Sequence, residues 1–217
     1  MLNKIKTKYK IITLFTLISS ILTGLHFIII TLLIGATYYI SLKKVIYAKR
    51  FKYFDNYLKQ IGKQEINVYL IKSKYPNAFN IGKNIFFSTE FIRRFRNDKD
   101  ILYATLGHEI GHYDEKHQII IIITSLIYVG ASTLLKESIN IKLTIGYLIT
   151  MLTLIWILEI KADLYSTKLS KENAIGLIKV LNQLKRFSLT HPPTWIRIKI
   201  LEKYLKGEIK WKRKKIQ

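Results

Sequence analysis

Two histidines and a glutamate stand together in the stretch HEIGHYDEKH, residues 108–117. His108 and His112 are four residues apart, so on a helix both imidazoles leave one face, one turn apart, and can ligate a single zinc ion. Glu109 would then lie beside the metal, where it can take a proton from a water molecule that the metal activates. Gly111 leaves space for a second helix to approach. The alternative interpretation is two surface histidines on an ordinary helix.

A third metal ligand must come from elsewhere, and a thiolate is excluded because the chain has no cysteine. On a continuous helix His117 would lie about 140° around from His112, so we expect a surface residue or a neighbour of the site. Glu159 is the better candidate, because it follows an apolar segment that returns the chain toward the histidines. Asp163 lies one turn further on, where it can orient a ligand imidazole, and the small Ala162 favours close packing. The alternative is a pair of ordinary acidic residues at a membrane boundary.

Two apolar segments lie between the histidines and Glu159. Residues 119–135 and 141–158 carry apolar side chains on every helical face, and only the polar stretch KESIN lies between them. Helices of this kind are typical of membrane spans. The sequence therefore predicts a transmembrane hairpin at about 119–158, with a pair of buried helices in a soluble protein as the alternative.

A further apolar segment, residues 11–42, contains no charged residue, and His26 is its only ionisable side chain. As a helix it would be roughly 48 Å long, more than the ~30 Å of a bilayer core. It is either one long tilted span or two short spans that turn near residues 23–26. We therefore expect an N-terminal membrane anchor at 1–42, and a second domain at 43–217 that contains the candidate zinc site and that the hairpin interrupts.

The charge distribution predicts how the chain crosses the membrane. Lys and Arg number 36 against 14 Asp and Glu, a formal net charge of +22, while 49% of the residues are hydrophobic. The basic residues are concentrated in residues 1–10, 43–118 and 159–217. The positive-inside rule places these segments in the cytoplasm and the short connection at 136–140 outside. Two spans in residues 11–42 then fit best, which predicts a multi-pass protein of the cytoplasmic membrane with the lipid bilayer as a partner.

The polar segments carry their own secondary-structure signals. The patterns predict an amphipathic helix at 43–62, a strand at 66–73, two short strands around a Gly-Lys-Asn turn in 75–90, a helix at 97–117 with Asn97 or Asp98 as its N-cap, a helix at 170–187 capped by Ser170, and a helix at 190–205 that begins after a Pro pair.

Four motifs occur in a fixed order: HEIGHYDEKH, the apolar hairpin, EIKAD at 159–163 and THPPTWIRIKIL at 190–201. Together with NAF at 77–79, they resemble the HtpX-type and CAAX prenyl endopeptidase family of integral-membrane zinc metalloproteases. The resemblance covers residues 65–205. The short chain and its brief N-terminal membrane region are closer to the HtpX-like branch than to the many-span prenyl proteases.

This resemblance implies a gluzincin core with one Zn²⁺ per chain. Its metal ligands would be His108, His112 and Glu159, Glu109 would be the general base, and proteolysis would occur at the cytoplasmic face of the membrane.

Two further segments gain possible roles from the resemblance. Asn77, Ala78 and Phe79 can belong to an edge strand on which a substrate peptide pairs in extended form, or to a purely structural hairpin. His191 and Arg197 can stabilise the oxyanion of a tetrahedral intermediate. Arg197 can equally pair with Asp163 and hold the fold together.

The sequence thus predicts a mainly α, integral-membrane protein: a zincin-like helical core with a small antiparallel β-sheet (α+β) and transmembrane helices. The predicted activity is hydrolysis of peptide bonds in membrane or membrane-proximal proteins, as in quality control. A regulatory signalling protease and a non-catalytic, zinc-stabilised membrane scaffold are the alternatives. A nucleic-acid binder would cluster its cations and aromatic residues, whereas here Lys and Arg are spread evenly over the cytoplasmic segments, so no nucleic acid is expected.

Overall fold

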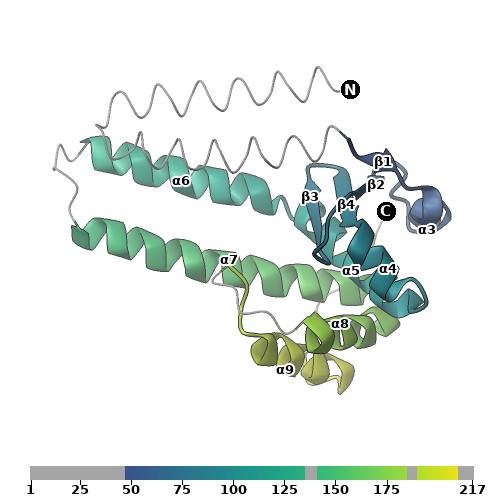
Figure 1. Cartoon of the computed structure of the whole chain (residues 1–217). Coiled ribbons are helices and arrows are strands. Elements are labelled where there is room, and N and C mark those ends of the chain that lie inside the picture. Colours follow the sequence, from purple (N-terminus) through teal and green to yellow (C-terminus); the bar gives the residue numbers. More distant parts are fainter. Residues whose placement is uncertain (1–46, 135–140, 185–189, 210–217) are drawn as a thin grey trace.

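The structure is a computed structural model that describes residues 47–134, 141–184 and 190–209, and it is mostly helical with one small sheet (Figure 1). The predicted membrane segment at 11–42 lies outside the described residues. The elements, in chain order, are β1 (Lys49–Arg50), the 3-10 helix η1 (Lys52–Phe54), α3 (Asp55–Gln60), β2 (Asn67–Ile71), β3 (Ala78–Ile81), β4 (Asn84–Ser88), α4 (Thr89–Phe95), α5 (Lys99–Asp114), α6 (His117–Leu134), α7 (Ile141–Leu169), α8 (Lys171–Leu184) and α9 (Thr194–Leu205).

The sheet has the strand order β1-β2-β4-β3 and is mixed, so the prediction of an antiparallel sheet is wrong. β1 pairs with β2, and β3 pairs with β4, in antiparallel fashion, whereas β2 and β4 are parallel. After β2 the chain crosses to the outer edge and forms β3. The turn at Gly82, where φ is 55°, then returns β4 into the gap between β3 and β2, in the direction of β2. The sequence pattern predicted β2, β3 and β4, but neither β1 nor this order.

The amphipathic helix predicted at 43–62 is not formed in the part that the structure describes, residues 47–62. Lys49 and Arg50 pair with β2, and the Phe51 N–H donates to the Val68 carbonyl over 2.8 Å. Phe54 is fully buried, with its ring stacked on that of Phe87. Pairing with the sheet and burial of this ring override the local helical pattern, and within this stretch only the short helices η1 and α3 are formed.

Helix α5 is the central element of the fold, because it packs against α7, α8 and the sheet. The Asp98 carboxylate caps its N-terminus by accepting a hydrogen bond from the Ile101 N–H, which confirms one of the two predicted N-caps. Every residue of α5 from Ile101 to Gly111 except Tyr103 is buried. The hydrophobic core around it includes Phe54, Leu58, Val68, Ile85, Phe87, Phe91, Leu102, Leu106, Ile110, Leu177 and Leu201.

The helix that contains the two histidines ends three residues earlier than predicted. Helix α5 stops at Asp114, and Lys116 adopts a left-handed conformation with φ of 54°. The Glu115 N–H donates to Gly111 and the Lys116 N–H to Tyr113, which closes the helix end. The chain therefore changes direction before His117, and a new helix begins there.

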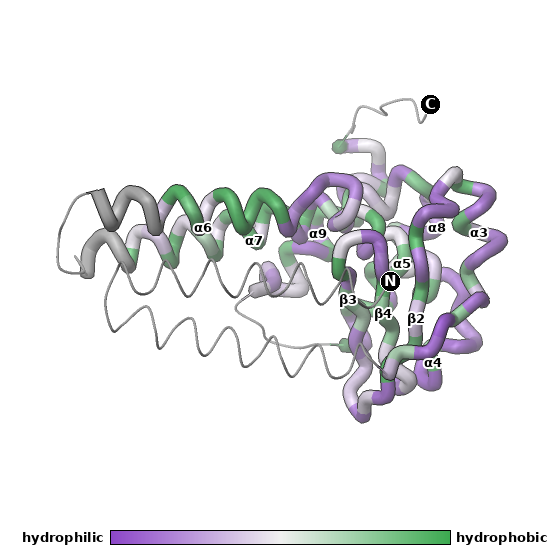
Figure 2. The backbone as a smooth tube through the Cα atoms, turned by 90° about the horizontal axis from the view of Figure 1, so that it is seen from above, coloured by the Kyte–Doolittle hydropathy of each residue, from purple (hydrophilic) through white to green (hydrophobic). Residues whose placement is uncertain are grey.

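Helices α6 and α7 lie side by side and extend together away from the sheet (Figures 1 and 2). The Tyr128 and Tyr147 rings stack at 3.9 Å between centroids, and the Ser125 and Tyr147 hydroxyls are 3.0 Å apart. Among the described residues one helix, Ile145–Leu169, is long and apolar enough to cross a membrane, and His117–Tyr128 is a shorter apolar helix. Large apolar side chains are exposed along the pair: Ile119, Ile122, Ile123, Leu126, Ile127, Ile145, Leu148, Ile149 and Ile157.

Gly176 allows α8 to approach α5 closely, and this contact predicts how a substitution changes stability. A Cβ atom at this position would lie 2.2 Å from the Asp100 carbonyl oxygen and 2.7 Å from the Ala104 Cβ. Gly176→Ala should therefore push α8 off α5 and lower the free energy of unfolding by about 1–3 kcal/mol or more. Urea unfolding in detergent, followed by circular dichroism, measures this change.

Gly146→Ala is the matched control, because no described atom lies within 4 Å of a Cβ built at Gly146 and alanine is the better helix former. We expect unchanged or slightly higher stability for this variant. Equal stability of Gly176→Ala and the parent protein would contradict the packing described here.

Candidate metal centre and active site

Helices α5 and α7 meet at Gly111 and Ala162, as the sequence predicted. A Cβ at Gly111 would be 3.1 Å from the Ala162 Cα and 2.9 Å from the Tyr165 Cβ. Ala162 is fully buried at this contact. Because neither residue carries a bulky side chain, the two helix backbones lie close together, and side chains from both helices reach one point.

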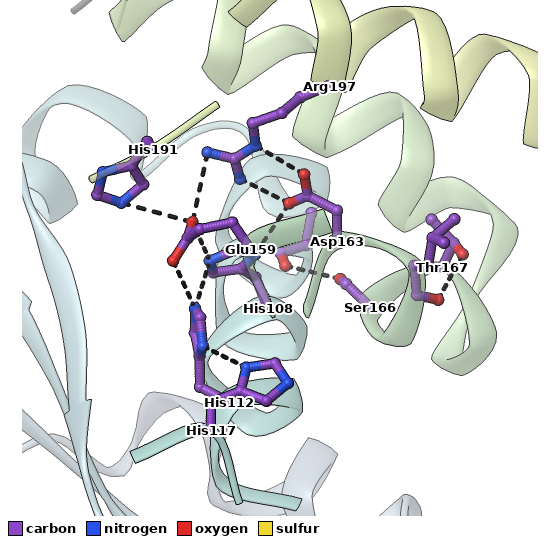
Figure 3. A network of polar contacts seen from close by, with 11 residues as sticks. His108, His112, His117, Glu159, Asp163, Ser166, Thr167, His191 and Arg197 are labelled. Carbon is purple, nitrogen blue, oxygen red and sulfur yellow. Dashed lines mark hydrogen bonds and ion pairs between the residues drawn. The ribbon is translucent and has the colours of Figure 1, made fainter. Parts of the chain in front are cut away.

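At that point the structure brings together the three predicted metal ligands (Figure 3). The Nε2 atoms of His108 and His112 are 3.0 Å apart. The Glu159 carboxylate from α7 lies 3.2 Å from the Nε2 of His112 and 3.6 Å from that of His108. One ligand atom from each residue lies within 4.8 Å of the other two, so the group can hold a metal ion.

The chemistry of this group fits a zinc ion. Ligand atoms about 2.0–2.1 Å from a tetrahedral zinc lie roughly 3.3 Å from one another, close to the separations seen here. The Glu159 Oε2 atom is buried and has no hydrogen-bond partner within the described chain. A cation at the centre would satisfy this oxygen and the two imidazole nitrogens that face each other, and three protein ligands leave a fourth position open, as in catalytic zinc sites.

The other ring nitrogen of each histidine is bound within the protein. The His108 Nδ1 lies 2.9 Å from the Asp163 carboxylate, and the His112 Nδ1 lies 2.8 Å from the Nδ1 of His117. When hydrogens occupy the Nδ1 atoms of the two ligands, their Nε2 lone pairs point at the metal position. Asp163 thus has the orienting role that the sequence suggested, and His117 has the same role for His112.

The contact between His117 and His112 is the feature that sequence reasoning missed. His117 is only 2% exposed and packs edge-on against the His112 ring. The prediction assumed one helix through residue 117, whereas the chain turns at Lys116. The polar run Asp114-Glu115-Lys116 between two apolar stretches was the available signal, because such a run favours a helix end.

Arg197 from α9 lies on the far side of Asp163. Its Nε and Nη2 atoms donate to the two Asp163 oxygens over 2.7 and 2.6 Å, a bidentate pair. Burial alone would lower the pKa of Arg197, but Asp163 raises this pKa above its usual range. Its Nη1 atom is 3.7 Å from Glu159. Of the two predicted roles for Arg197, the structure shows the pairing with Asp163.

Glu109 and His191 complete the set of ionisable groups around the cluster. Glu109 is 6% exposed. Burial raises the pKa of Glu109, and the opposing influence of His108 and His112 does not cancel this effect. The side chain of His191 is half exposed, its Nε2 is 3.5 Å from the Glu159 carboxylate, and burial lowers the pKa of His191. The imidazole of His191 is therefore neutral near pH 7 and faces the candidate metal position.

The segment Asn77-Ala78-Phe79 leads into the outer strand of the described sheet. Ala78 and Phe79 belong to β3, and the Asn77 carbonyl accepts from the Ser88 N–H. Phe79 stacks on Phe86 of the neighbouring strand. Helix α5 packs against β3, so this edge of the sheet lies next to the helix that carries both histidines.

Comparison with protein families matches residues 57–205 to peptidase family M48. The chain belongs to this family. The match spans the metal cluster and the Asp163–Arg197 pair, and M48 proteins are metallopeptidases, so this chain is a metallopeptidase, a hydrolase. The predicted family and enzyme class are thereby confirmed. Comparison with curated proteins finds no match.

The candidate metal centre predicts graded effects on zinc retention. Glu159→Ala removes one of the three candidate ligands and should abolish stoichiometric zinc binding. His117→Ala leaves the ligands in place but releases the His112 ring, so zinc affinity should fall by about 10–100-fold. Metal content after dialysis against graded chelator concentrations measures both effects.

Glu202→Ala, which removes an exposed carboxylate of α9, serves as the control and should retain zinc like the parent protein. Full zinc occupancy in Glu159→Ala would show that Glu159 is not a ligand.

Proposed function

We propose that this M48 metallopeptidase is a membrane-embedded zinc endopeptidase of the HtpX-like quality-control type. Its active site would lie at the cytoplasmic face of the cell membrane and cleave membrane or membrane-proximal proteins. The observation that carries the proposal is the position of the cluster at the base of the apolar hairpin, because α6 begins five residues after His112 and Glu159 lies on α7 itself.

Glu109 performs the proton transfers in the proposed reaction. A zinc ion held by His108, His112 and Glu159 would act as a Lewis acid that polarises the scissile carbonyl and activates water. The Glu109 carboxylate takes the proton from the attacking water and passes it to the leaving amine. Its buried position suits this role, since a raised pKa allows one group both to accept and to release a proton.

His191 is the proposed donor to the oxygen that gains negative charge. Its neutral imidazole faces the cluster and remains partly open to solvent, so a substrate can reach it. An N–H donor at this position stabilises developing charge in the transition state. Arg197 supports the reaction indirectly, because its pairing with Asp163 keeps the His108 ring in place.

The edge of β3 is the proposed substrate platform. An extended peptide can add to an exposed sheet edge through main-chain hydrogen bonds, and the segment Asn77-Ala78-Phe79 provides such an edge beside α5. Pairing by backbone atoms accepts many sequences, which suits an enzyme that removes unfolded or unassembled membrane proteins.

The exposed apolar side chains of α6 and α7 support insertion of the hairpin into the bilayer. Side chains such as Ile122, Ile127 and Ile149 are half exposed or more, and a soluble protein would not expose so many along one helical pair. The basic residues of segments 43–118 and 159–217 support a cytoplasmic location for the catalytic part. Segments that emerge from the membrane would then arrive next to the active site.

The catalytic proposal predicts the effect of Glu109→Gln. The amide has nearly the same shape but cannot accept the proton, so hydrolysis should fall by ~10²–10⁴-fold while zinc content stays unchanged. Casein cleavage by the zinc-loaded, detergent-purified protein measures the rate. Glu115→Gln, an exposed position in the same stretch, should cleave like the parent protein. Undiminished cleavage by Glu109→Gln would refute the assigned mechanism.

The membrane proposal predicts which positions an impermeant thiol reagent can label in intact cells. The chain has no native cysteine, so single cysteines can replace Lys4, Lys59, Ser138 and Lys206 one at a time. Only the cysteine at Ser138 should react, because the other three positions face the cytoplasm. If the cysteine at Lys4 also reacts, and those at Lys59 and Lys206 do not, residues 11–42 form a single span. Labelling at Lys59 or Lys206 would overturn the topology.

A further inference from the structure

The outer edge of β3 has a defined set of backbone groups. Asn77 is hydrogen bonded to β4 through its carbonyl, and the antiparallel register pairs Phe79 with Phe86 and Ile81 with Asn84. Backbone groups alternate along a strand, so those of Ala78 and Asn80, together with the N–H of Gly82, point away from β4. These are the groups that an added strand would use.

The side chain of Gln118 already occupies one end of this edge. Gln118 is the second residue of α6, and its Nε2 donates to the Asn80 carbonyl over 2.8 Å. Its Oε1 accepts from the Gly82 N–H over 3.2 Å. One carboxamide thus binds one outward acceptor and one outward donor, as the peptide group of a neighbouring strand would.

These two hydrogen bonds divide the β3 edge into an open part and a closed part. The outward groups of Ala78 and the Asn80 N–H lie on the open side, toward the start of the strand. The Asn80 carbonyl and the Gly82 N–H are bound to Gln118. A peptide that pairs along β3 can extend past Asn80 only if it displaces the Gln118 amide.

We propose that Gln118 is a specificity-determining residue that ends substrate pairing at Asn80. It thereby limits the length of peptide held on the β3 edge and sets its register relative to the metal centre. This inference rests on the proposed function, in which an extended peptide pairs with β3.

The start of α6 has other contacts that hold it in place. The Ile119 and Ile120 N–H groups donate to the Lys116 carbonyl, and His117 packs against His112. Gln118 itself is exposed, and its amide lies on the surface where a peptide would bind. Its two hydrogen bonds therefore act on the strand edge more than on the anchoring of the helix.

Peptide binding as a function of length tests the inference. The probes are unstructured peptides built around a cleavage site mapped in casein and extended one residue at a time at each end. Dissociation constants are measured by fluorescence anisotropy with full-length, zinc-loaded protein in detergent. All proteins carry Glu109→Gln so that the peptides stay intact. The parent keeps Gln118, and two further variants carry Gln118→Ala or Gln118→Glu in addition. Gln183→Ala replaces an exposed glutamine of α8 and is the matched control.

With Gln118 present, extension at one peptide end should stop lowering the Kd at a fixed length. In Gln118→Ala the next one or two residues should lower the Kd further, by about 2- to 10-fold, since each freed backbone group gains a hydrogen bond. Gln118→Glu keeps the acceptor for Gly82 but places an oxygen against the Asn80 carbonyl, so its profile should lie between the two. Gln183→Ala should match the parent profile.

The inference is overturned if the parent with Gln118 and the Gln118→Ala variant show the same dependence of Kd on peptide length, whether Kd stays constant or falls. The proposed function is tested separately by the chain with Glu109 intact. If that chain cleaves the same peptides while the length profiles coincide, peptidase activity stands and only the role of Gln118 is refuted. A purely structural role would change zinc content or stability and would leave the length profile unaltered.

Discussion

The buried carboxylate of Asp163 is the interaction on which the arrangement of the site depends. It lies on α7, is 1% exposed, and contacts His108 on α5 and Arg197 on α9. Removing these charged groups from water is costly, and a buried ion pair of this kind contributes little net stability. Its effect is to fix three helices in one arrangement, because loss of Asp163 or Arg197 would leave the buried charge of the other without its ion-pair partner. The His108 ring and the Glu159 carboxylate, one turn before Asp163, are positioned by that arrangement.

The apolar hairpin and the active site share the same helices. Helix α7 runs without a break from its apolar half through Glu159 and Asp163. Helix α6 begins at His117, which contacts His112, and continues with Gln118, which binds the edge of β3. The base of the hairpin is therefore part of the candidate metal centre. In the proposed membrane setting, this places the peptide-binding edge and the metal ligands at the surface of the bilayer.

The parts of the site that follow from local spacing could be predicted from the sequence. His108 and His112 share a helical face because they are four residues apart, and an apolar hairpin of matched lengths returns Glu159 to them. Features set by tertiary pairing could not be predicted. The insertion of β4 beside β2 depends on a long-range crossover, and Lys49 and Arg50 join the sheet despite a helical pattern. The left-handed turn at Lys116 brought His117 onto His112, which a continuous helix would have prevented.

The most direct test of the central claim is the zinc K-edge X-ray absorption spectrum of the purified, full-length protein. If His108, His112 and Glu159 hold the metal, the protein contains one zinc per chain. Its spectrum then shows two imidazole ligands together with oxygen donors. A spectrum with three or more imidazoles would place His117 or His191 among the ligands in place of Glu159. That result, or a chain that binds no stoichiometric zinc, would contradict the account.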